Sequence, residues 1–410
     1  MKKLITLILS AAAVTSAVAQ DTAFTAPNHE VNFELGKGLN YSFNEGAYQF
    51  KISGMMQPYF AVENNENADE PDYLMNSKRT YLNFSGKALE EKVSFFFQAD
   101  FSLNDPLLDA WVAYQPFGNF IVTAGQKQNI TNNREMLFME TNLQFPDRSL
   151  LSTSFSQTGR EFGLFVENTF GGDRFAVVPQ VSVTSGDGRN SFGSDSRDVD
   201  LGGVKYGARL DVYPLGLFTE GNEKLVADLA HEEKPKLVIG GAYSYNDGAS
   251  NAVGEGHGDV YLYNALGEQQ LPDYRQVYAD ILFNYKGFSL LGEYALATAT
   301  SLEGSYADEA ATEVIIPTQI SEFLALGSAY NAQIGYVTKS GYALDLRYSQ
   351  VTPEFEDNAN SIITETTGYT VGFSKYFKDN ALKLQVAGSS YDNELTGNTF
   401  MGEFLVQVIF

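Results

Sequence analysis

The chain has 410 residues, of which 44% are hydrophobic and 13% aromatic, with 30 Phe, 24 Tyr, one Trp, three His and no Cys. So few His and Cys argue against disulfide frameworks, Cys-rich zinc sites and thiol catalysis, and we expect neither a metal nor a cofactor. The formal net charge of −24 argues against a nucleic-acid partner, because phosphate binding requires a basic surface.

The first residues, 1–19, have the order of a secretory signal peptide. Two lysines precede an apolar run, and a small-residue cleavage pattern ends at Ala19. No later apolar stretch reaches the roughly 18 residues that a transmembrane helix needs, so a membrane location would require a closed β-barrel. We assign 20–46 to a periplasmic segment and 47–410 to the barrel domain.

Apolar and polar side chains alternate with a two-residue period along most of the chain. In one segment Phe95 and Phe97 alternate with Gln98 and Asp100. This period over about 8–12 residues is typical of β-strands with one apolar face. About 16 strands are expected, at 47–62, 76–86, 92–101, 108–115, 119–127, 160–168, 174–184, 203–213, 236–246, 276–286, 288–298, 323–338, 341–351, 366–377, 381–390 and 399–410.

The connections between these strands differ in length in a regular way. Short turns such as 116–118 and 339–340 alternate with long loops such as 128–159 and 299–322. This pattern predicts an all-β, transmembrane, antiparallel β-barrel with short periplasmic turns and long extracellular loops. The segment 214–235 is long where a short turn is expected, and we treat it as an insertion.

A secreted β-sandwich adhesin would show the same alternation, with its apolar face as core. Aromatic residues at strand ends, an even strand number and strands of about 10 residues favour the barrel. The last strand places Phe400, Phe404 and the terminal Phe410 on one face. We assign Phe410 as an assembly signal, and expect outer-membrane lipid, lipopolysaccharide and the barrel-assembly machinery as partners.

The polar face of such strands would line a water-filled lumen. Cationic and anionic side chains occur there in equal numbers, so they either pair with each other or form a transverse field with Arg clusters as weak anion sites. Arg160 has the phase of the apolar face, and we leave it out. The pore-lining candidates are Arg79, Lys205, Arg209, Arg347, Lys383, Asp100, Asp109, Asp211, Asp280, Glu293 and Asp345, and Arg174, Lys236 and Glu403 share their phase.

The loop 128–159 contains apolar side chains such as Met136, Phe138 and Phe145. These would be unfavourable in water, and folding into the barrel would bury them. We therefore expect this loop to form a pore constriction.

Motifs for catalysis are weak. Gly254–Gly258 is Gly-rich but lacks the residues of a phosphate-binding loop, and Asp187, Asp195, Asp198 and Asp200 lack calcium-loop spacing. His29, His231 and His257 are isolated, so no Ser-His-Asp site is expected. We expect no enzymatic activity, although an outer-membrane barrel enzyme remains an alternative.

Several short motifs occur in an order that resembles the phosphate-selective porin O and P family. They include Gly36-Lys37-Gly38-Leu39, Lys78-Arg79-Thr80-Tyr81-Leu82, Asp109-Ala110-Trp111-Val112, Gly125-Gln126-Lys127, Arg160-Glu161-Phe162-Gly163, Ala208-Arg209-Leu210, Leu346-Arg347-Tyr348 and Lys383-Leu384-Gln385.

The resemblance implies a homotrimeric, 16-stranded outer-membrane porin whose third loop narrows the pore. The family's arginine ladder and lysine-rich cluster have no position-by-position match here. We expect passive diffusion of small hydrophilic solutes or ions, with a phosphate- or polyphosphate-selective channel as the alternative.

Overall fold

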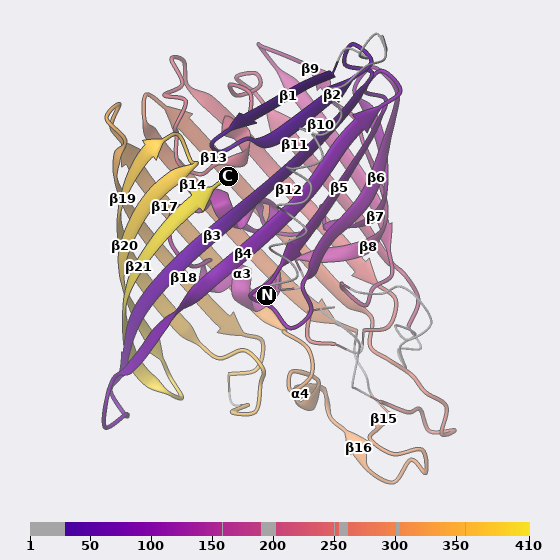
Figure 1. Ribbon diagram of the computed structural model, residues 1–410. Coiled ribbons are helices and arrows are strands. Elements are labelled where there is room, and N and C mark those ends of the chain that lie inside the picture. Colours follow the sequence, from indigo (N-terminus) through magenta and orange to yellow (C-terminus); the bar gives the residue numbers. More distant parts are fainter. Residues whose placement is uncertain are drawn as a thin grey trace, which may run out of the picture.

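The computed structural model describes residues 29–157, 159–189, 202–249, 251–253, 261–300, 304–356 and 358–410. Within these ranges, 16 antiparallel strands close into a barrel, because the last strand pairs with the first strand of the ring (Figure 1). The expected signal peptide, Gly254–Gly258, His257, Asp195, Asp198 and Asp200 lie outside the described residues.

Each strand of the ring overlaps one of the strands expected from the sequence. Long loops join the strands at one end of the barrel, the loop end, and short turns join most of them at the other, the turn end. The ring consists of β3 (Tyr48–Asn65), β4 (Asp72–Ala88), β5 (Val93–Asp100), β6 (Leu107–Phe117), β7 (Phe120–Gln128), β8 (Arg160–Glu167), β10 (Ala176–Thr184), β11 (Lys205–Tyr213), β12 (Lys236–Asn246), β13 (Tyr274–Tyr285), β14 (Phe288–Ala299), β17 (Gly327–Val337), β18 (Tyr342–Pro353), β19 (Thr366–Lys378), β20 (Leu382–Asn393) and β21 (Gly397–Ile409).

The two faces of the wall have opposite polarity. On β18, Asp345 and Arg347 point inward and are 1% and 4% exposed, whereas the outward Leu344 and Leu346 are 56% and 43% exposed. Exposed apolar and buried charged side chains are the reverse of a soluble protein, and they match a barrel wall that faces lipid. The β-sandwich alternative is therefore wrong, because the sheet is closed on itself.

The helices of the described residues are short. None of them is long and apolar enough to span a bilayer.

A two-stranded hairpin precedes the ring. It consists of β1 (His29–Glu34) and β2 (Gly38–Phe43), and β2 pairs with the first residues of β3. Among the described residues the sheet therefore begins at His29, inside the segment 20–46 that the sequence analysis assigns to the periplasm. Strand β21 ends midway along β3, so the edge of β3 between Tyr48 and Ile52 remains available for β2.

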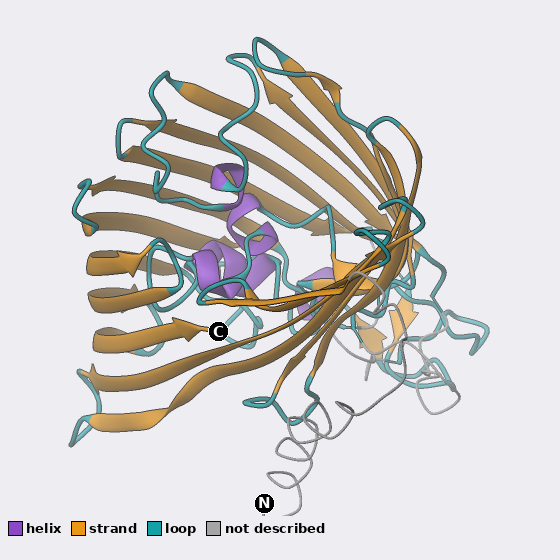
Figure 2. Cartoon of the chain, turned by 45° about the horizontal axis from the view of Figure 1, so that its top comes forward, coloured by secondary structure: helices purple, strands orange, loops and turns teal. Residues whose placement is uncertain are grey.

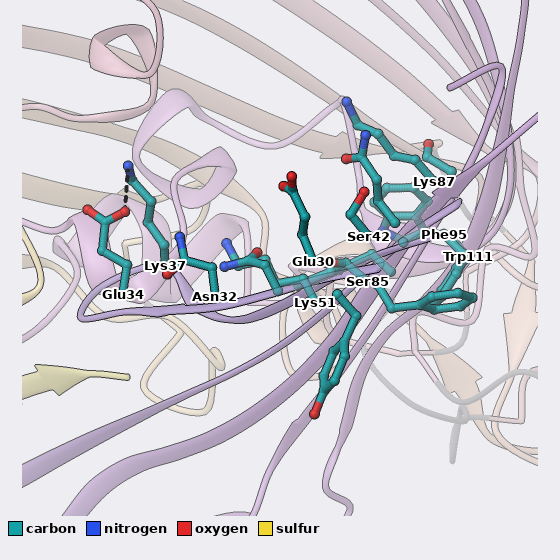
Figure 3. A pocket seen from close by; sticks show the side chains of 17 residues that line it. Glu30, Asn32, Glu34, Lys37, Ser42, Lys51, Ser85, Lys87, Phe95 and Trp111 are labelled. Atoms are coloured by element: carbon teal, nitrogen blue, oxygen red, sulfur yellow. Dashed lines mark ion pairs between the residues drawn. The ribbon is translucent and has the colours of Figure 1, made fainter. Parts of the chain in front are cut away.

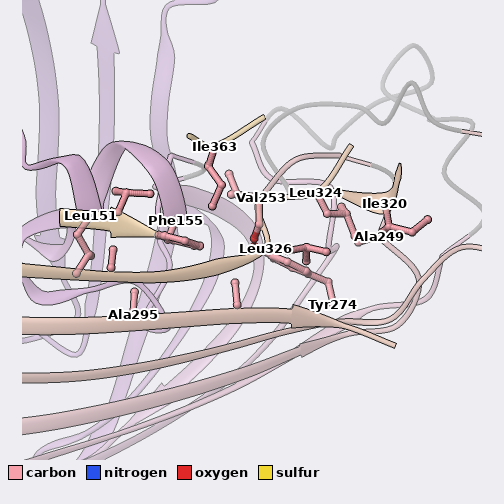
Figure 4. Close-up of a cluster of buried hydrophobic side chains, with 14 of the residues drawn as sticks. Leu151, Phe155, Ala249, Val253, Tyr274, Ala295, Ile320, Leu324, Leu326 and Ile363 are labelled. Carbon is pink, nitrogen blue, oxygen red and sulfur yellow. Dashed lines mark hydrogen bonds between the residues drawn. The ribbon is translucent and has the colours of Figure 1, made fainter. Parts of the chain in front are cut away.

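The loop between β7 and β8 folds into the barrel. It contains α2 (Arg134–Leu137), the 3-10 turn η1 (Glu140–Asn142) and α3 (Leu150–Phe155), and these lie inside the ring of strands (Figure 2). Leu151 and Phe155 of α3 pack with Tyr274 of β13 and with residues of the long loops (Figure 4). This apolar cluster forms the largest core of the molecule among the described residues.

The insertion 214–235 enters the barrel from the turn end. Its Phe218 and Val226 pack with Phe138 of the β7–β8 loop and with Leu282 of β13. The insertion contains η2 (Asn222–Lys224), and the remaining short elements are β9 (Phe170–Gly171), β15 (Ser305–Tyr306), β16 (Val314–Ile315) and α4 (Pro317–Ile320). The insertion and α3 together fill the side of the lumen next to β10–β19.

Candidate functional site

Arg134 attaches α2 to the barrel wall through a buried cluster of four charges. Its guanidinium contacts Asp211 of β11 at 2.6 Å and Asp280 of β13 at 2.5 Å. Arg209 contacts the same two carboxylates at 3.0 and 2.6 Å. Two arginines and two aspartates alternate, so each buried charge has opposite charges beside it.

A second attachment involves Arg160 and Glu140. Arg160 contacts Asp109 at 2.8 Å and Glu140 at 3.4 Å, while Arg148 contacts Glu140 at 2.9 Å. Burial opposes ionisation of Glu140, but Arg160, Arg148 and Arg79 hold its pKa well below the usual value. The loop carboxylate therefore stays ionised between cations.

Arg160 lies inside the barrel although its sequence phase is that of the apolar face. It is the first residue of β8, and both Arg160 and the next residue, Glu161, are buried. The side chain follows the end of the loop rather than the alternation of the strand, and this is why the periodicity argument excluded it wrongly.

Glu135 is the centre of a third set of contacts. Its carboxylate accepts hydrogen bonds from Ser149, Ser152 and Gln333, and lies 3.9 Å from Arg347. Burial would raise the pKa of Glu135, but Arg347, Arg148 and the serine hydroxyls lower it. The backbone N–H of Glu135 donates to Glu293 at 2.8 Å.

The remaining candidates are also occupied. Lys383 donates to the carbonyls of Thr141 and Leu143 at 2.9 and 3.0 Å. Asp345 accepts from Gln144 at 3.0 Å. Lys205 pairs with Glu161 at 2.9 Å rather than with a loop group.

The structure places the predicted site residues in specific contacts rather than along an open, charged lumen wall. All of the pore-lining candidates except Arg79 are buried, and most of them contact loop groups or pair with a charge of the wall. The buried ones are Lys205, Arg209, Arg347, Lys383, Asp100, Asp109, Asp211, Asp280, Glu293 and Asp345, and Glu403 is buried with them, whereas Arg174 is exposed and Lys236 half-buried near the turn end.

The sequence analysis missed the charged residues of the loop itself. These are Arg134, Glu135, Glu140, Asp147 and Arg148. The apolar side chains of the loop predict its burial but say nothing about its charged contacts. The signal was available, because a loop that enters a charged lumen needs partners of opposite sign.

Open space remains on the side of β3–β6. At the loop end a cavity of about 360 Å³ is lined by Arg79, Tyr81, Asp100 and the loop residue Met136. At the turn end a cavity of about 400 Å³ is lined by Ser53, Asn83, Phe96 and the loop residue Met139.

The two cavities lie on opposite sides of the loop, against the same wall. On β4, Arg79 lines the first and Asn83 the second, with Tyr81 between them. These positions are four residues apart, or about 13 Å along a strand. On β5, Asp100 and Phe96 repeat this arrangement around Gln98, which donates to Asn83 at 3.0 Å.

No known family model matches the sequence, and no curated protein matches it. Among solved structures, the trimer form of OmpT, an outer membrane protein of Vibrio cholerae, matches with a TM-score of 0.51 and 9% identity, over 88% of this chain and 99% of that chain.

Two further structures match with lower scores. OprB of Pseudomonas putida matches with a TM-score of 0.49 and 13% identity, over 89% of this chain and 94% of that chain. A triple mutant of the Rhodopseudomonas blastica porin matches with a TM-score of 0.45 and 13% identity, over 88% of this chain and 100% of that chain. At these identities the likeness concerns the fold alone, which is that of an outer-membrane β-barrel protein.

Proposed function

We propose that the protein is an outer-membrane porin that lets small hydrophilic solutes and ions diffuse through its lumen. The pair of cavities on either side of the 128–159 loop carries this proposal. They approach each other along β3–β6. On β4, Tyr81 lines the loop-end cavity and the next inward residue, Asn83, lines the turn-end cavity, and on β5 only the inward position Gln98 lies between the two linings. The loop is then the constriction, and Met136 and Met139 form its side of the conduit.

The buried charges support a fixed constriction rather than a mobile lid. Arg134, Glu135 and Glu140 each pair with or hydrogen-bond to the barrel wall or the loop itself. Removing one partner of a buried ion pair typically costs about 3–5 kcal/mol, so releasing several together is unfavourable.

The location belongs to the same proposal. The outward apolar face of the strands fits the outer-membrane lipid, with the turn end in the periplasm and the loop end outside, facing lipopolysaccharide. We propose further that the protein forms a homotrimer and that the barrel-assembly machinery recognises Phe410. The OmpT structure is described as a trimer form, and this supports the oligomer only by analogy.

We propose transport rather than catalysis. The buried carboxylates beside the loop hydrogen-bond to loop groups or pair with arginines, so their contacts serve to position the loop. A barrel enzyme would need a reactive group facing one of the cavities, and we can nominate no such group among the described residues.

One observation favours a phosphate- or polyphosphate-selective channel as a second candidate. The loop-end cavity is lined by more cations than anions: Lys78, Arg79, Arg148, Arg160 and Arg189 against Asp100 and Glu140. Arg79 donates to Gln57 at 2.9 Å and to the carbonyl of Pro146 at 3.2 Å, both neutral acceptors. A phosphate oxygen would be a stronger acceptor for its guanidinium.

Single-channel recording in a salt gradient tests both candidates. A porin should conduct with a reversal potential near zero and no saturable block by phosphate. Strong anion preference with saturable block by millimolar phosphate would favour the second candidate. A folded, heat-modifiable protein that never conducts would refute both.

A further inference from the structure

A third cavity, of about 630 Å³, lies under the β1–β2 hairpin at the turn end (Figure 3). Its lining comes from the hairpin and from the first turn-end residues of β3–β6. None of its described lining residues belongs to the 128–159 loop. Its size lies within the range of small-molecule pockets, about 300–1,000 Å³.

Strand register places one row of side chains across the wall of this cavity. Residues opposite each other on paired strands share a face, and each step across the sheet is about 4.8 Å. The row runs from the free edge of the hairpin to β6 and consists of Asn32, Asn40, Lys51, Ser85, Phe96 and Trp111. It therefore changes from amides through an ammonium and a hydroxyl to two aromatic rings.

The aromatic end of this row faces open space. The rings of Phe96 and Trp111 lie 5.8 Å apart and both are half-buried. Other inward aromatic residues, such as Tyr274, Tyr278 and Phe165, are buried to 3% exposure or less. Those three contribute to packing, whereas Phe96 and Trp111 present uncovered apolar faces inside a polar lumen.

The polar side chains around these rings are available to a ligand. Among the described residues, the hydroxyls of Ser85 and Ser94 have no protein hydrogen bond and Lys51 has no carboxylate partner. Hydroxyl and amide groups both donate and accept. They suit a ligand that has many hydroxyl groups.

The charge of the cavity is nearly balanced. Lys37 pairs with Glu34 at 3.1 Å, and Lys87 pairs with Glu91 at 2.8 Å. Lys51 and Glu30 remain, with opposite signs. The cavity thus differs from the cationic cavity at the loop end, and it favours an uncharged ligand.

We infer that this row is a binding site for a neutral saccharide, which rests on the proposed channel function and adds a solute class to it. A sugar ring has apolar C–H faces, which can stack on the rings of Phe96 and Trp111, while its hydroxyls bond to the serines and amides. A ligand entering or leaving through the turn end would occupy this site next to the constriction.

Trp111 is the only Trp of the chain, so its fluorescence reports on this site alone. The test titrates the purified, detergent-solubilised full chain with maltotriose, with inorganic phosphate and tetraethylene glycol as comparison solutes. We expect maltotriose alone to cause a saturable change in emission. Phe96→Ala, which keeps the reporter, should weaken the apparent affinity about tenfold, the equivalent of one good aromatic contact.

Channel block in planar bilayers provides the second measurement. Maltotriose should interrupt the current of the wild type and of Tyr114→Ala, which removes an outward ring from the same strand, but much less that of Trp111→Ala. Heat-modifiable migration checks that each variant is folded.

The outcomes separate the two proposals. Normal conductance without any maltotriose-dependent emission change would overturn the saccharide site and leave the channel standing. An equal response to phosphate or to the glycol would also overturn it. A saturable maltotriose response in a protein that never conducts would support the site and refute the channel.

Discussion

Gly54 and Phe410 close the barrel at the turn end, where each donates its backbone N–H to the carbonyl of the other. The N···O distances are 2.6 Å from Gly54 and 2.9 Å from Phe410. The ring of Phe410 fills the space beside Gly54, because a Cβ added there would lie 2.7 Å from it. The position of the Phe410 ring therefore requires a glycine at position 54 of β3.

Gly54→Val should impair barrel closure about as much as Phe410→Asp does. The valine would collide with the Phe410 ring and displace it. The aspartate removes the ring, and its charge near a bilayer interface costs only about 0–1 kcal/mol in itself, so the loss of the ring is what both variants share. The measurement is the fraction of heat-modifiable protein in the outer membrane. Gly402→Ala is the matched control on β21, since nothing lies within 4 Å of a Cβ at Gly402. Normal assembly of both Gly54→Val and Phe410→Asp would show that the contact between Gly54 and Phe410 is not needed for barrel closure.

Arg134→Met should loosen the loop. It leaves Asp211 and Asp280 with Arg209 as their remaining close cation, and breaking a buried pair costs about 3–5 kcal/mol. We expect increased current noise and protease cleavage within 128–159. Arg174→Ala, at an exposed position, should leave both unchanged.

A second substitution distinguishes charge from packing at this cluster. Asp211→Asn combined with Arg134→Met removes one uncompensated charge and should recover part of the lost stability. Identical noise in the single variant and the wild type would refute the anchoring role of Arg134.

The loop should remain attached under mildly acidic conditions. The lowered pKa of Glu140, and likewise of Glu135 and Asp147, means that their contribution to stability is complete above the ordinary carboxyl pKa. This contribution to stability decreases once the pH falls below the ordinary carboxyl pKa, and it is lost as the pH falls through the lowered pKa of the folded protein. We expect quiet currents at pH 5 and increasing noise well below pH 4.

Glu140→Gln provides the comparison for the acid response. The neutral amide cannot be protonated in this range, so the variant should start noisier and change less with pH. A wild type that becomes noisy near pH 6 would contradict the assignment of this response to Glu140.

Strand positions could be predicted from the sequence because alternation reports directly which face meets lipid. On β18 the outward Leu344 and Leu346 and the inward Asp345 and Arg347 give an unambiguous two-residue period. Periodicity also placed Asp211 and Asp280 on the inward face, where they contact the loop, but it excluded Arg160, which contacts the loop as well. It could not show that the loop covers them, since contacts such as Lys383 with the carbonyl of Leu143 join residues far apart in the sequence.

Features outside the alternation were harder to predict. The β1–β2 hairpin is short, and its pairing depends on β21 ending before β3 does, which no local pattern reveals. The insertion 214–235 was recognised by its length alone. Its burial against Leu282 depends on the shape of the lumen rather than on its own composition.

Asn83→Trp should reduce single-channel conductance by about half or more, because it places a large ring in the conduit beside the constriction. Asn83 lines the turn-end cavity and lies between Ser53 of β3 and Gln98 of β5. The insertion 214–235 and α3 fill the opposite side of the lumen, so no parallel path should compensate. Phe84→Trp, on the same strand but facing outward, is the control and should conduct like the wild type. Unchanged conductance in folded Asn83→Trp would show that solutes pass elsewhere, and the assignment of the conduit to β3–β6 would then be wrong.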